Sequence, residues 1–479
     1  AAFEEIYAQP RTAYLDPSFS AYAQDTWRIS HALTMTFGVR WEVAPASRVT
    51  AGTALVAGGL TNLNDASNLY FIPQGKPFYP TTYSNFAPRL GLAWQVFGGP
   101  SKATVLRVGA GRFFGSAQAG FQDSIIGPSV ANFYTSPPLQ SLFSSTPSAI
   151  GAQTLIGVAA APHYRLPVTY QWNVTIQQVF GAQTLSAAYV GALGRHLADY
   201  ALSPLTDSAG LLIYPVGSDA SSSYHSMQGQ FNRRLPGTLQ VLASYTWSHS
   251  IDNLSNDIGV DYDVRSLTQY NPLNPNGARG PSDFDIRHSL KGAVIAQLPS
   301  PRQGAWAAAL GHWSAESIFF ARSALPTDVV SNLSVNGRPN YVYGAPLYLY
   351  GSLYPGGKRY NPDAFVEPPN GKNGNFGRNV LRGFGAWQID LALHREIRLS
   401  ERSRLQFRAE AFNVLNHPNF ADPHYGGAPG LVYFPDPGFG LSKQTLANGL
   451  GPSLTPGELN PLFQIGGPRV VQFAVRFLH

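Results

Sequence analysis

Apolar and polar residues alternate along this chain in several stretches of about ten residues, which is the pattern of a β-strand with one apolar face. The segment 33–43, LTMTFGVRWEV, places an apolar side chain at every odd position, from Leu33 to Val43, and polar or small residues between them. The segments 89–96, RLGLAWQV, and 387–397, WQIDLALHREI, divide in the same way. A tilted strand needs about 9–11 residues to cross a bilayer. These lengths therefore fit a membrane-spanning strand as well as a strand of a soluble sandwich.

The same alternation predicts thirteen strands, joined by connections of two kinds. The strands lie near residues 19–30, 33–45, 85–97, 103–115, 168–180, 183–194, 224–234, 237–251, 286–298, 312–323, 385–397, 402–415 and 468–478. Tight links such as HA at 31, GGPSK at 98, GA at 181 and LPG at 235 alternate with long segments, for example 46–84, 116–167, 332–384 and 416–467. Outer-membrane barrels have short periplasmic turns and long extracellular loops, whereas a sandwich has no reason to sort its loops. We therefore predict an all-β fold, a transmembrane antiparallel up-and-down β-barrel.

The direction of the strands carries a further expectation about the size of the barrel. Strand 19–30 leads into a short turn and so runs toward the periplasm, as the last strand does. Bacterial barrels have an even number of strands with both termini in the periplasm, and an open sheet would leave unpaired edges in lipid. We expect residues 1–479 to be the C-terminal part of a single larger barrel domain, with the first strands absent from this chain.

Composition agrees with a β-protein and excludes several functions. Aromatic residues make up 13% of the chain, and 48 Gly and 38 Pro favour strands and turns over helices. The chain has no cysteine, which excludes a disulfide framework and a thiolate site. Its net charge of +6 is spread without a basic run, so we predict no nucleic-acid partner. No apolar run approaches the ~20 residues of a transmembrane helix.

Six blocks follow one another from residue 19 onward: FSAYAQDTWRISHALTMTFGVRWEV, NFAPRLGLAWQVFGGPSKATVLRVGAGRFFG, QWNVTIQQVFGAQTLSAAYVGALGRHL, YHSMQGQFNRRLPGTLQVLASYTWSHSIDN, RGPSDFDIRHSL and LQFRAEAFNVLNHPNF. Together they resemble the TonB-dependent receptors of the Oar-like group. The resemblance implies a 22-stranded barrel with a plug domain inside it, often preceded by an N-terminal carboxypeptidase-regulatory-like domain, and transport energised by the TonB complex. All six blocks belong to the barrel, so the resemblance leaves the plug domain outside this chain.

Motifs of catalysis are weak. The sequence contains no H-E-x-x-H, G-x-S-x-G or P-loop pattern, and GAGRFFG at 109 lies inside an alternating strand and opens no helix. Small glycines facing a crowded lumen or a bend explain that segment better than a phosphate cradle. We predict that the protein is not an enzyme and has no cofactor.

An acidic segment raises the question of a metal. Residues 249–266, HSIDNLSNDIGVDYDVRS, supply the carboxylates of Asp252, Asp257, Asp261 and Asp263. Carboxylates in a flexible loop can hold Ca²⁺. Their spacing does not match an EF-hand, however, and a solvated acidic loop or Asx-turn caps is the favoured interpretation. We therefore predict no metal site and keep these four residues as a weak calcium candidate.

The segment RGPSDFDIRH, residues 279–288, is the sharpest local motif and allows two interpretations. Its candidate residues are Arg279, Asp283, Asp285, Arg287 and His288. They could form a substrate-contacting cluster at the rim of the barrel. The favoured alternative is an internal ion-pair network that guides the long loop back into its strand.

Charged residues at the polar positions of the strands are expected inside the barrel. These lumen candidates are Arg40, Glu42, Arg107, Arg112, Asp390, His394, Arg408 and Glu410. Most are expected to pair with one another or with the plug, and a minority to contact substrate. Tryptophans within or near the strands are expected in part at the membrane interfaces: Trp27, Trp41, Trp94, Trp172, Trp247, Trp313 and Trp387.

The last strand, RVVQFAVRFLH, alternates most regularly of all. Its apolar face carries Val471, Phe473, Val475 and Phe477. The resemblance implies that the barrel-assembly machinery recognises such a final strand by apolar residues counted back from an aromatic terminal residue. His479 stands where the family usually has Phe, so we expect a weakened assembly signal.

These observations together predict a TonB-dependent receptor and transporter of the bacterial outer membrane. The chain would supply the barrel wall, in contact with lipid, and the extracellular loops that capture a small or oligomeric solute. An adhesin or a passive porin-like barrel is the alternative from another class. A secreted β-sandwich protein that acts on glycans is a further alternative, and the sequence does not identify the solute.

Overall fold

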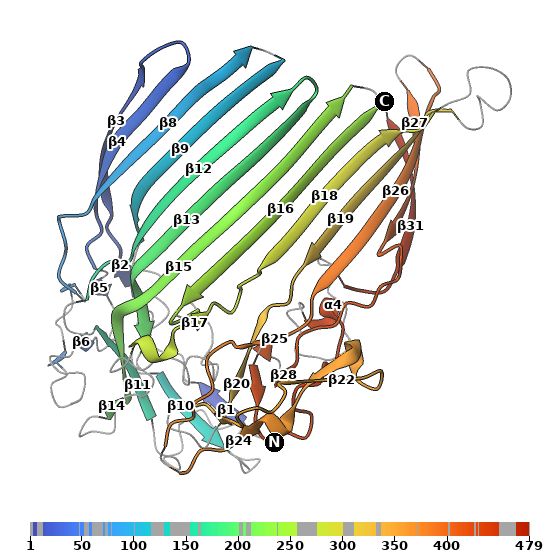
Figure 1. Cartoon of the computed structure of the whole chain (residues 1–479). Coiled ribbons are helices and arrows are strands. Elements are labelled where there is room, and N and C mark those ends of the chain that lie inside the picture. The colour runs from blue at the N-terminus through green and yellow to red at the C-terminus, as the bar shows by residue number, and fades with distance from the viewer. Residues whose placement is uncertain are drawn as a thin grey trace.

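The chain forms one large curved β-sheet with long loops gathered at one end (Figure 1). The computed structural model describes residues 3–6, 13–46, 48–51, 57–59, 70–71, 75–77, 79–99, 101–115, 129–134, 154–160, 164–200, 205–206, 212–236, 238–255, 275–299, 311–331, 337–370, 372–400, 403–425, 428–429, 431–449 and 466–478. Within these residues, thirteen long strands form what we call the wall. Each wall strand pairs antiparallel with the next along the chain.

The wall strands coincide with the thirteen predicted strands. They are β3 (Phe19–Arg28), β4 (Leu33–Val43), β8 (Phe86–Gly99), β9 (Lys102–Phe114), β12 (Val168–Phe180), β13 (Gln183–Tyr200), β15 (Leu212–Leu235), β16 (Leu239–Asp252), β18 (His288–Gln297), β19 (Trp313–Arg322), β26 (Ala386–Arg398), β27 (Arg404–Phe412) and β31 (Val470–Leu478). The predicted all-β fold is therefore confirmed. The largest differences are in β13 and β15, which extend beyond their predicted ends at the loop side.

The remaining elements are short and lie in the loops. The strands are β1 (Phe3–Ile6), β2 (Ala13–Leu15), β5 (Arg48–Ala51), β6 (Ala57–Gly59), β7 (Tyr70–Phe71), β10 (Ser129–Tyr134), β11 (Thr154–Ala160), β14 (Leu205–Thr206), β17 (Gly280–Pro281), β20 (Pro326–Val330), β21 (Asn340–Tyr341), β22 (Tyr348–Tyr350), β23 (Lys358–Tyr360), β24 (Phe365–Val366), β25 (Leu381–Arg382), β28 (His424–Tyr425), β29 (Ala428–Pro429) and β30 (Leu431–Tyr433). The helical turns are η3 (Pro275–Ala278), η4 (Pro355–Gly357), η5 (Pro362–Ala364) and α4 (Leu446–Gly449). Among the described residues, no helix has the length and apolarity needed to cross a membrane.

The pairing register defines two chemically different faces of the wall. Side chains directly opposite each other on neighbouring antiparallel strands share a face. Trp94 of β8 lies opposite both Leu33 of β4 and Leu106 of β9, and apolar side chains continue this face across the wall. Several are well exposed, for example Leu90 at 51% and Phe473 at 81%. We call this the outer face, because an apolar surface of this extent fits the lipid side of a barrel.

The tryptophans of the wall lie in two belts on the outer face. Near the loop ends of their strands are Trp41, Trp172, Trp247 and Trp387; near the turn ends are Trp27, Trp94 and Trp313. On β4, the position opposite Trp94 is eight residues from Trp41, which is about 26 Å at ~3.3 Å per residue. Because barrel strands tilt by about 35–45°, this length corresponds to roughly 20 Å along the membrane normal, which is comparable with the ~25 Å apolar band of a membrane barrel. The two belts therefore occupy the positions of the interfacial girdles.

Connections between wall strands are sorted by length, as predicted. Short turns occupy one end, at residues 29–32, 100–101, 181–182, 236–238 and 399–403; the segment 298–312 is longer and lies at the same end. At the other end the long connections are 44–85, 115–167, 253–287, 323–385 and 413–469, with the shorter 201–211 among them. Figure 1 shows the turns at the top with the C-terminus, and the loops at the bottom. The turn end faces the periplasm and the loop end faces the cell exterior.

Part of the loop end is a folded unit with its own core. We call the described residues of 323–385 and 413–449 the cap. In the cap, β20 pairs with β25 and β30, β21 with β24, and β22 with β23. Buried side chains from all of these regions pack together: Val329, Tyr360, Ala364, Phe365, Phe376, Leu381, Val432 and Phe439. The cap therefore has a fixed shape of its own beyond the wall.

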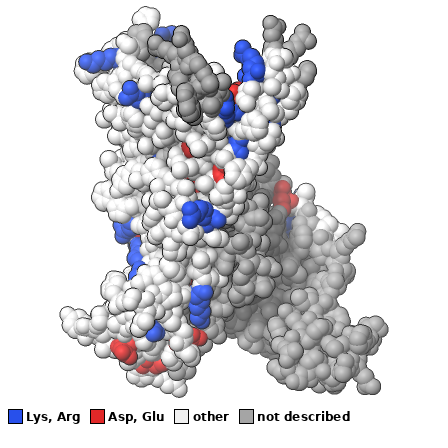
Figure 2. Space-filling view, turned by 90° about the vertical axis from the view of Figure 1, so that its right-hand side faces the viewer, with Lys and Arg blue, Asp and Glu red and all other residues white. Residues whose placement is uncertain are grey.

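The two outermost wall strands each have one neighbour within the described residues. β3 pairs with β4 alone, and β31 pairs with β27 alone. The side chains of β3 are exposed along its whole length. Figure 2 looks at the wall from the side of β26, β27 and β31, and charged side chains are scattered there between much larger neutral areas. Within the part of the chain that the structure describes, the wall is therefore an open curved sheet whose two edge strands have one partner each.

Candidate functional site

Arginines of the cap meet carboxylates at the extracellular ends of β16 and β18. The Arg378 side chain is fully buried, with Nη1 2.5 Å from Asp252 Oδ1 and Nη2 3.1 Å from Asp283 Oδ1. Arg382 Nη2 lies 2.7 Å from Asp285 Oδ2. Burial alone would lower the pKa of Arg378, but the charges of Asp283 and Asp252 raise it above its ordinary value. We call Asp252, Asp283, Asp285, Arg378 and Arg382 the anchor network.

Asp285 is the most heavily bonded carboxylate of the anchor network. Its Oδ1 accepts the backbone N–H of Ser250 at 2.7 Å and lies 3.2 Å from His249 Nδ1, while Arg287 Nε is 3.1 Å from Oδ2. Arg287 also donates to His249 Nε2, so Nδ1 carries the proton that faces Asp285. Burial raises the pKa of Asp285, but the bonds from Ser250, Arg382 and His249 outweigh it and lower that pKa. The carboxylate therefore stays ionised at neutral pH.

A further ion pair extends the anchor network into the cap. Arg338 donates to both oxygens of Asp328, at 2.7 and 3.1 Å, and both side chains are buried. The backbone N–H of Asn379 donates to Asp328 Oδ1 at 3.1 Å, and its side-chain amide donates to Asp283 Oδ1 at 2.6 Å and to Pro281 O at 2.7 Å. Asn379 thus joins the cap strand β20 to the segment that leads from β17 into β18. These bonds give the cap one defined orientation on the wall.

The five candidates of RGPSDFDIRH are divided by the structure. Asp283, Asp285 and Arg287 take part in ion pairs, which is the geometry of the favoured network interpretation. Arg279 lies outside these pairs and donates to a serine hydroxyl of β15 at 3.4 Å. His288 lies on the outer face, where its Nδ1 is 2.7 Å from a tyrosine hydroxyl of β16. The five residues therefore do not form one network, and contact of any of them with substrate stays a prediction.

Of the four calcium-candidate residues, Asp252 is the one that lies among the described residues. Asp252 is buried, paired with Arg378, and accepts the Ser255 hydroxyl at 2.7 and 3.0 Å. Its oxygens are committed to these partners. The other three candidates, Asp257, Asp261 and Asp263, lie outside the described residues.

A row of polar side chains crosses four strands on the inner face of the wall. Glu316 lies at its centre, with Oε1 3.3 Å from His394 Nδ1 and Oε2 2.9 Å from Arg408 Nη2. Arg408 Nε is 2.5 Å from Glu410 Oε1, and Glu410 in turn accepts from Gln472 of β31. We call these five residues the lumen row. Arg408 pairs with both glutamates of the row, as expected for charges inside a barrel, whereas His394 lies near Glu316 without a hydrogen bond to it.

Other lumen candidates also lie on the inner face and have local partners. Arg40 Nε is 2.6 Å from Glu42 Oε1, and Arg40 also donates to a serine of β3 at 2.9 Å. Arg107 donates to a glutamine of β12. Asp390 accepts the backbone N–H of Asn413 at 2.8 Å and thereby holds the start of the following loop. The proposed contact of any of these residues with substrate stays a prediction.

Arg112 does not face the lumen, contrary to the sequence prediction. It lies opposite Tyr170, and the register between β9 and β12 continues without a shift to Arg107. Residues five positions apart on a regular strand point to opposite faces. The Arg112 guanidinium lies 4.4 Å from the Phe114 ring centroid and 5.7 Å from that of Tyr170. It belongs to the outer face near the loop end, where aromatic rings support its charge.

Several residues of these networks were not predicted from the sequence. Glu316 could have been found, because the alternation of WSAESIFF assigns it to the polar face. Arg338, Arg378 and Arg382 lie in loop sequence rich in Gly and Asn, where no periodicity indicates their direction. Asp328 lies in β20, which is buried on both faces. For these four residues the partners are fixed by tertiary contacts alone.

The terminal strand has the predicted faces. Val471, Phe473, Val475 and Phe477 lie opposite outer-face residues of β27, and all four are exposed. His479 lies outside the described residues. Recognition of this strand by the assembly machinery stays a prediction.

A wall with a lipid-compatible outer face, two tryptophan belts and a polar inner face defines an outer-membrane β-barrel. The chain belongs to the family described as outer membrane beta barrel domain, whose model matches residues 1–445. The protein is therefore a barrel of the bacterial outer membrane, as predicted. The family and the single continuous wall exclude the secreted β-sandwich alternative. A comparison with curated proteins finds no match.

Three solved structures illustrate the similarity of this chain to known proteins. The FpvAI–pyocin S2 complex is 10% identical with a TM-score of 0.47, and the FrpB iron transporter from Neisseria meningitidis is 10% identical with a TM-score of 0.45. The outer membrane transporter YddB from Escherichia coli is 12% identical with a TM-score of 0.44. They match 98%, 85% and 98% of this chain. The chain spans 40%, 42% and 54% of their respective lengths.

Proposed function

We propose that this chain forms the wall and the extracellular cap of a TonB-dependent outer-membrane receptor of the Oar-like type. In this proposal the cap and neighbouring loops capture a scarce solute outside the cell. A plug domain supplied by the full-length protein closes the lumen, and the TonB complex moves the plug so that the solute passes. The chain itself performs no catalytic step.

The observation that carries the proposal is the anchored cap. A passive pore needs only a polar lumen, and long loops without a core would serve it. Here the loops 323–385 and 413–449 have a buried apolar core and are tied to the wall through Arg378 and Arg382. A rigid extracellular surface loses little conformational entropy when it binds a ligand. Such a surface supports solute capture better than free diffusion does.

The lumen row supports the same proposal. Glu316, Arg408 and Glu410 already form ion pairs across the wall, and exchange of partners within such a row allows a polar body to slide past without leaving a charge unpaired. A plug domain is a body of this kind. The row thus offers a surface from which a plug can be displaced at moderate cost.

The test compares solute uptake in three strains of the source bacterium: the wild type, a deletion of the full-length gene, and a strain without TonB. We expect at least one solute of the growth medium to be depleted by the wild type alone. Equal depletion with and without TonB would contradict energised transport and favour a passive barrel. Unchanged depletion in the deletion strain, together with lost surface attachment, would favour the adhesin.

The matched variants separate capture from assembly. Arg378→Met should abolish uptake by loosening the cap, while Arg404→Met, at an exposed pair with Glu396 on the turn side, should leave it unchanged. Both proteins must reach the outer membrane in equal amounts. Normal uptake by Arg378→Met with a loosened cap would contradict a role for the cap in capture.

A further inference from the structure

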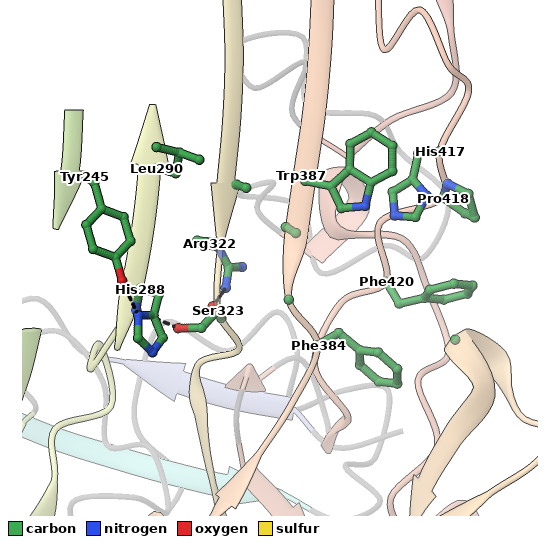
Figure 3. Close-up of a pocket in the computed structure, with 14 residues that line it drawn as sticks. Tyr245, His288, Leu290, Arg322, Ser323, Phe384, Trp387, His417, Pro418 and Phe420 are labelled. Carbon is green, nitrogen blue, oxygen red and sulfur yellow. Dashed lines mark hydrogen bonds between the residues drawn. The ribbon is translucent and has the colours of Figure 1, made fainter. Parts of the chain in front are cut away.

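A groove lies on the outer face where the cap meets the wall (Figure 3). Its floor is one row of side chains across four neighbouring strands: Tyr245 of β16, Leu290 of β18, Ala321 of β19 and Trp387 of β26. The groove has a volume of about 490 Å³, within the range of sites that hold small ligands. It opens on the same face as the apolar surface of the wall.

The groove exists because small residues interrupt a row of large ones. Ala321 stands between Leu290 and Trp387, which are two strands apart and so separated by about 10 Å. The small residues Gly385 and Ala386 line the adjoining end. Two residues along the strands toward the periplasm, the Phe319 ring lies against Gly292 and closes the floor of the groove. The result is a notch about as wide as one or two extended hydrocarbon chains.

The cap provides a roof that overhangs the outer face. The rings of Phe384 and Phe420 lie 5.7 Å apart, and Gly356 of η4 packs so closely on both that a Cβ there would clash. His417 stacks on Trp387 with ring centroids 4.1 Å apart. Figure 3 shows these rings on one side of the groove and Tyr245, His288 and Leu290 on the other. The groove is therefore walled by aromatic rings that come from both the cap and the wall.

The extracellular rim of the groove is polar. The backbone N–H of His288 donates to Ser323 Oγ at 3.0 Å, and Arg322 Nη1 donates to Ser323 O at 3.1 Å. Behind the roof, Lys358 Nζ lies 4.9 Å from the Phe384 ring centroid. Burial raises the pKa of the nearby Asp422, although the Phe384 N–H, Arg322 and Lys358 offset part of that effect. Of these charged groups Arg322 lines the groove itself, whereas Lys358 donates to the backbone carbonyls of Arg382 and Gly383.

We propose that this groove binds lipopolysaccharide of the outer leaflet, with one acyl chain in the notch over Ala321 and a phosphate at the polar rim. The outer face is in contact with lipid, and the groove lies at the level of the extracellular tryptophan belt, where the acyl chains of the outer leaflet end. An apolar notch with no occupant there would forfeit dispersion contacts on one side. The guanidinium of Arg322, which lines the groove, complements the phosphates of lipid A.

The site is independent of solute transport, because it lies on the outer face and includes neither the anchor network nor the lumen row. Its occupant would tie the cap to the membrane surface through Phe384, Phe420 and His417. A lipid is thus a structural partner of this barrel, distinct from any solute that crosses it.

The test fills the notch and measures bound lipid by native mass spectrometry. The full-length gene product is purified from outer membranes in detergent and titrated with diphosphoryl lipid A or with phosphatidylethanolamine. Ala321→Phe should reduce lipid A binding at least fivefold, and the smaller Ala321→Leu should reduce it to a lesser degree. Ala315→Phe is the matched control, because Ala315 lies on the outer face of the same strand but far from the groove.

The outcomes separate this proposal from its alternatives. Unchanged lipid A binding in both Ala321 variants would overturn it, as would an equal loss in Ala315→Phe. Loss of phosphatidylethanolamine binding without loss of lipid A binding would assign the groove to a phospholipid and overturn the choice of lipopolysaccharide. Ala321→Leu keeps the test valid if Ala321→Phe fails to fold, which is checked by the heat-dependent shift of the barrel on gels. Solute uptake, measured separately, reports on the transport proposal.

Discussion

Arg378 is the residue on which the attachment of the cap depends most. It is fully buried and serves Asp252 and Asp283 at once, together with the Ser255 hydroxyl at 2.5 Å. Its removal would leave two carboxylates without their main partner in a site of low exposure. Breaking a buried pair in this way typically costs about 3–5 kcal/mol, whereas an exposed pair contributes about 0–1 kcal/mol.

We therefore expect Arg378→Met to free the cap for local opening. Hydrogen exchange of the cap amides in the detergent-solubilised full-length protein should speed up by orders of magnitude, with the wall amides unchanged. Arg404→Met should change neither, because the Arg404–Glu396 pair is half exposed at 3.7 Å. Unaltered cap exchange in Arg378→Met would show that the apolar core alone holds the cap.

Asp285 makes the stability of the anchor network depend on pH, and this stability is lost only on the acid side. Its pKa in the folded protein is lowered by its hydrogen bonds in spite of burial, below the ~3.9 of an unfolded Asp. A depressed pKa contributes stability that is present above the unfolded value and is lost as pH falls through the folded one. The protection factors of the cap amides, in which the intrinsic pH dependence of exchange is divided out, should therefore stay constant from pH 8 to about 5 and fall below about pH 4. Asp285→Asn should remove part of that acid dependence, and an unchanged profile in this variant would assign it to other groups.

The alternation of apolar and polar residues predicted the direction of the wall side chains better than that of the anchor-network side chains. Glu42 and Arg408 face the lumen as predicted because each sits in a regular strand, where position determines direction. Arg112 lies five positions from Arg107 on the same strand, so the same rule places it on the outer face and the prediction for it is wrong. Arg378 and Arg382 carry no such signal, since a loop without periodicity leaves side-chain direction to distant contacts. Their partners are more than ninety positions away in the chain.

At the scale of elements, the strands that were predicted best are those whose environment is the same at every second residue. A strand between lipid and lumen keeps one apolar and one polar face along its length, so its sequence records both. The cap strand β20 is buried throughout, and β25 has two residues, so neither has an alternating pattern. β13 and β15 exceed their predicted bounds because register shifts near Gly194 and Leu197 break the alternation. Tertiary packing decides these elements.

The terminal strand β31 gives a prediction at the same scale. Phe477 lies on the outer face and Arg476 on the inner face. If the apolar face is what the assembly machinery recognises, Phe477→Ser should lower the amount of folded protein in the outer membrane severalfold. Arg476→Ser alters the same strand without touching that face and should have little effect. His479→Phe should raise the yield, and equal losses from both serine variants would contradict recognition by the apolar face.

At the scale of the whole molecule, the two edge strands of the wall determine which further strands a closed barrel needs. β3 and β31 each lack a second neighbour within the described residues. In hydrocarbon, every unpaired backbone group costs several kcal/mol, so both edges need partners in the membrane. We propose that the remaining strands of a larger barrel, of 22 strands by the resemblance, are supplied by the full-length polypeptide. They would join β3 to β31 and complete the lumen around the plug.

This proposal predicts different behaviour for residues 1–479 and for the full-length gene product. Expressed alone with a signal peptide, residues 1–479 should accumulate poorly in the outer membrane and be degraded by added protease, because the open edges cannot be buried in lipid. The full-length product should give a protease-resistant band that migrates faster before heating than after. Cysteines introduced at Gln24 on β3 and Gln472 on β31, which lie on the inner faces of the two edges, should not cross-link in the full-length barrel, because about nine strands separate these positions in a 22-stranded wall. Efficient cross-linking would mean that the thirteen strands close on themselves, and the larger barrel would be wrong.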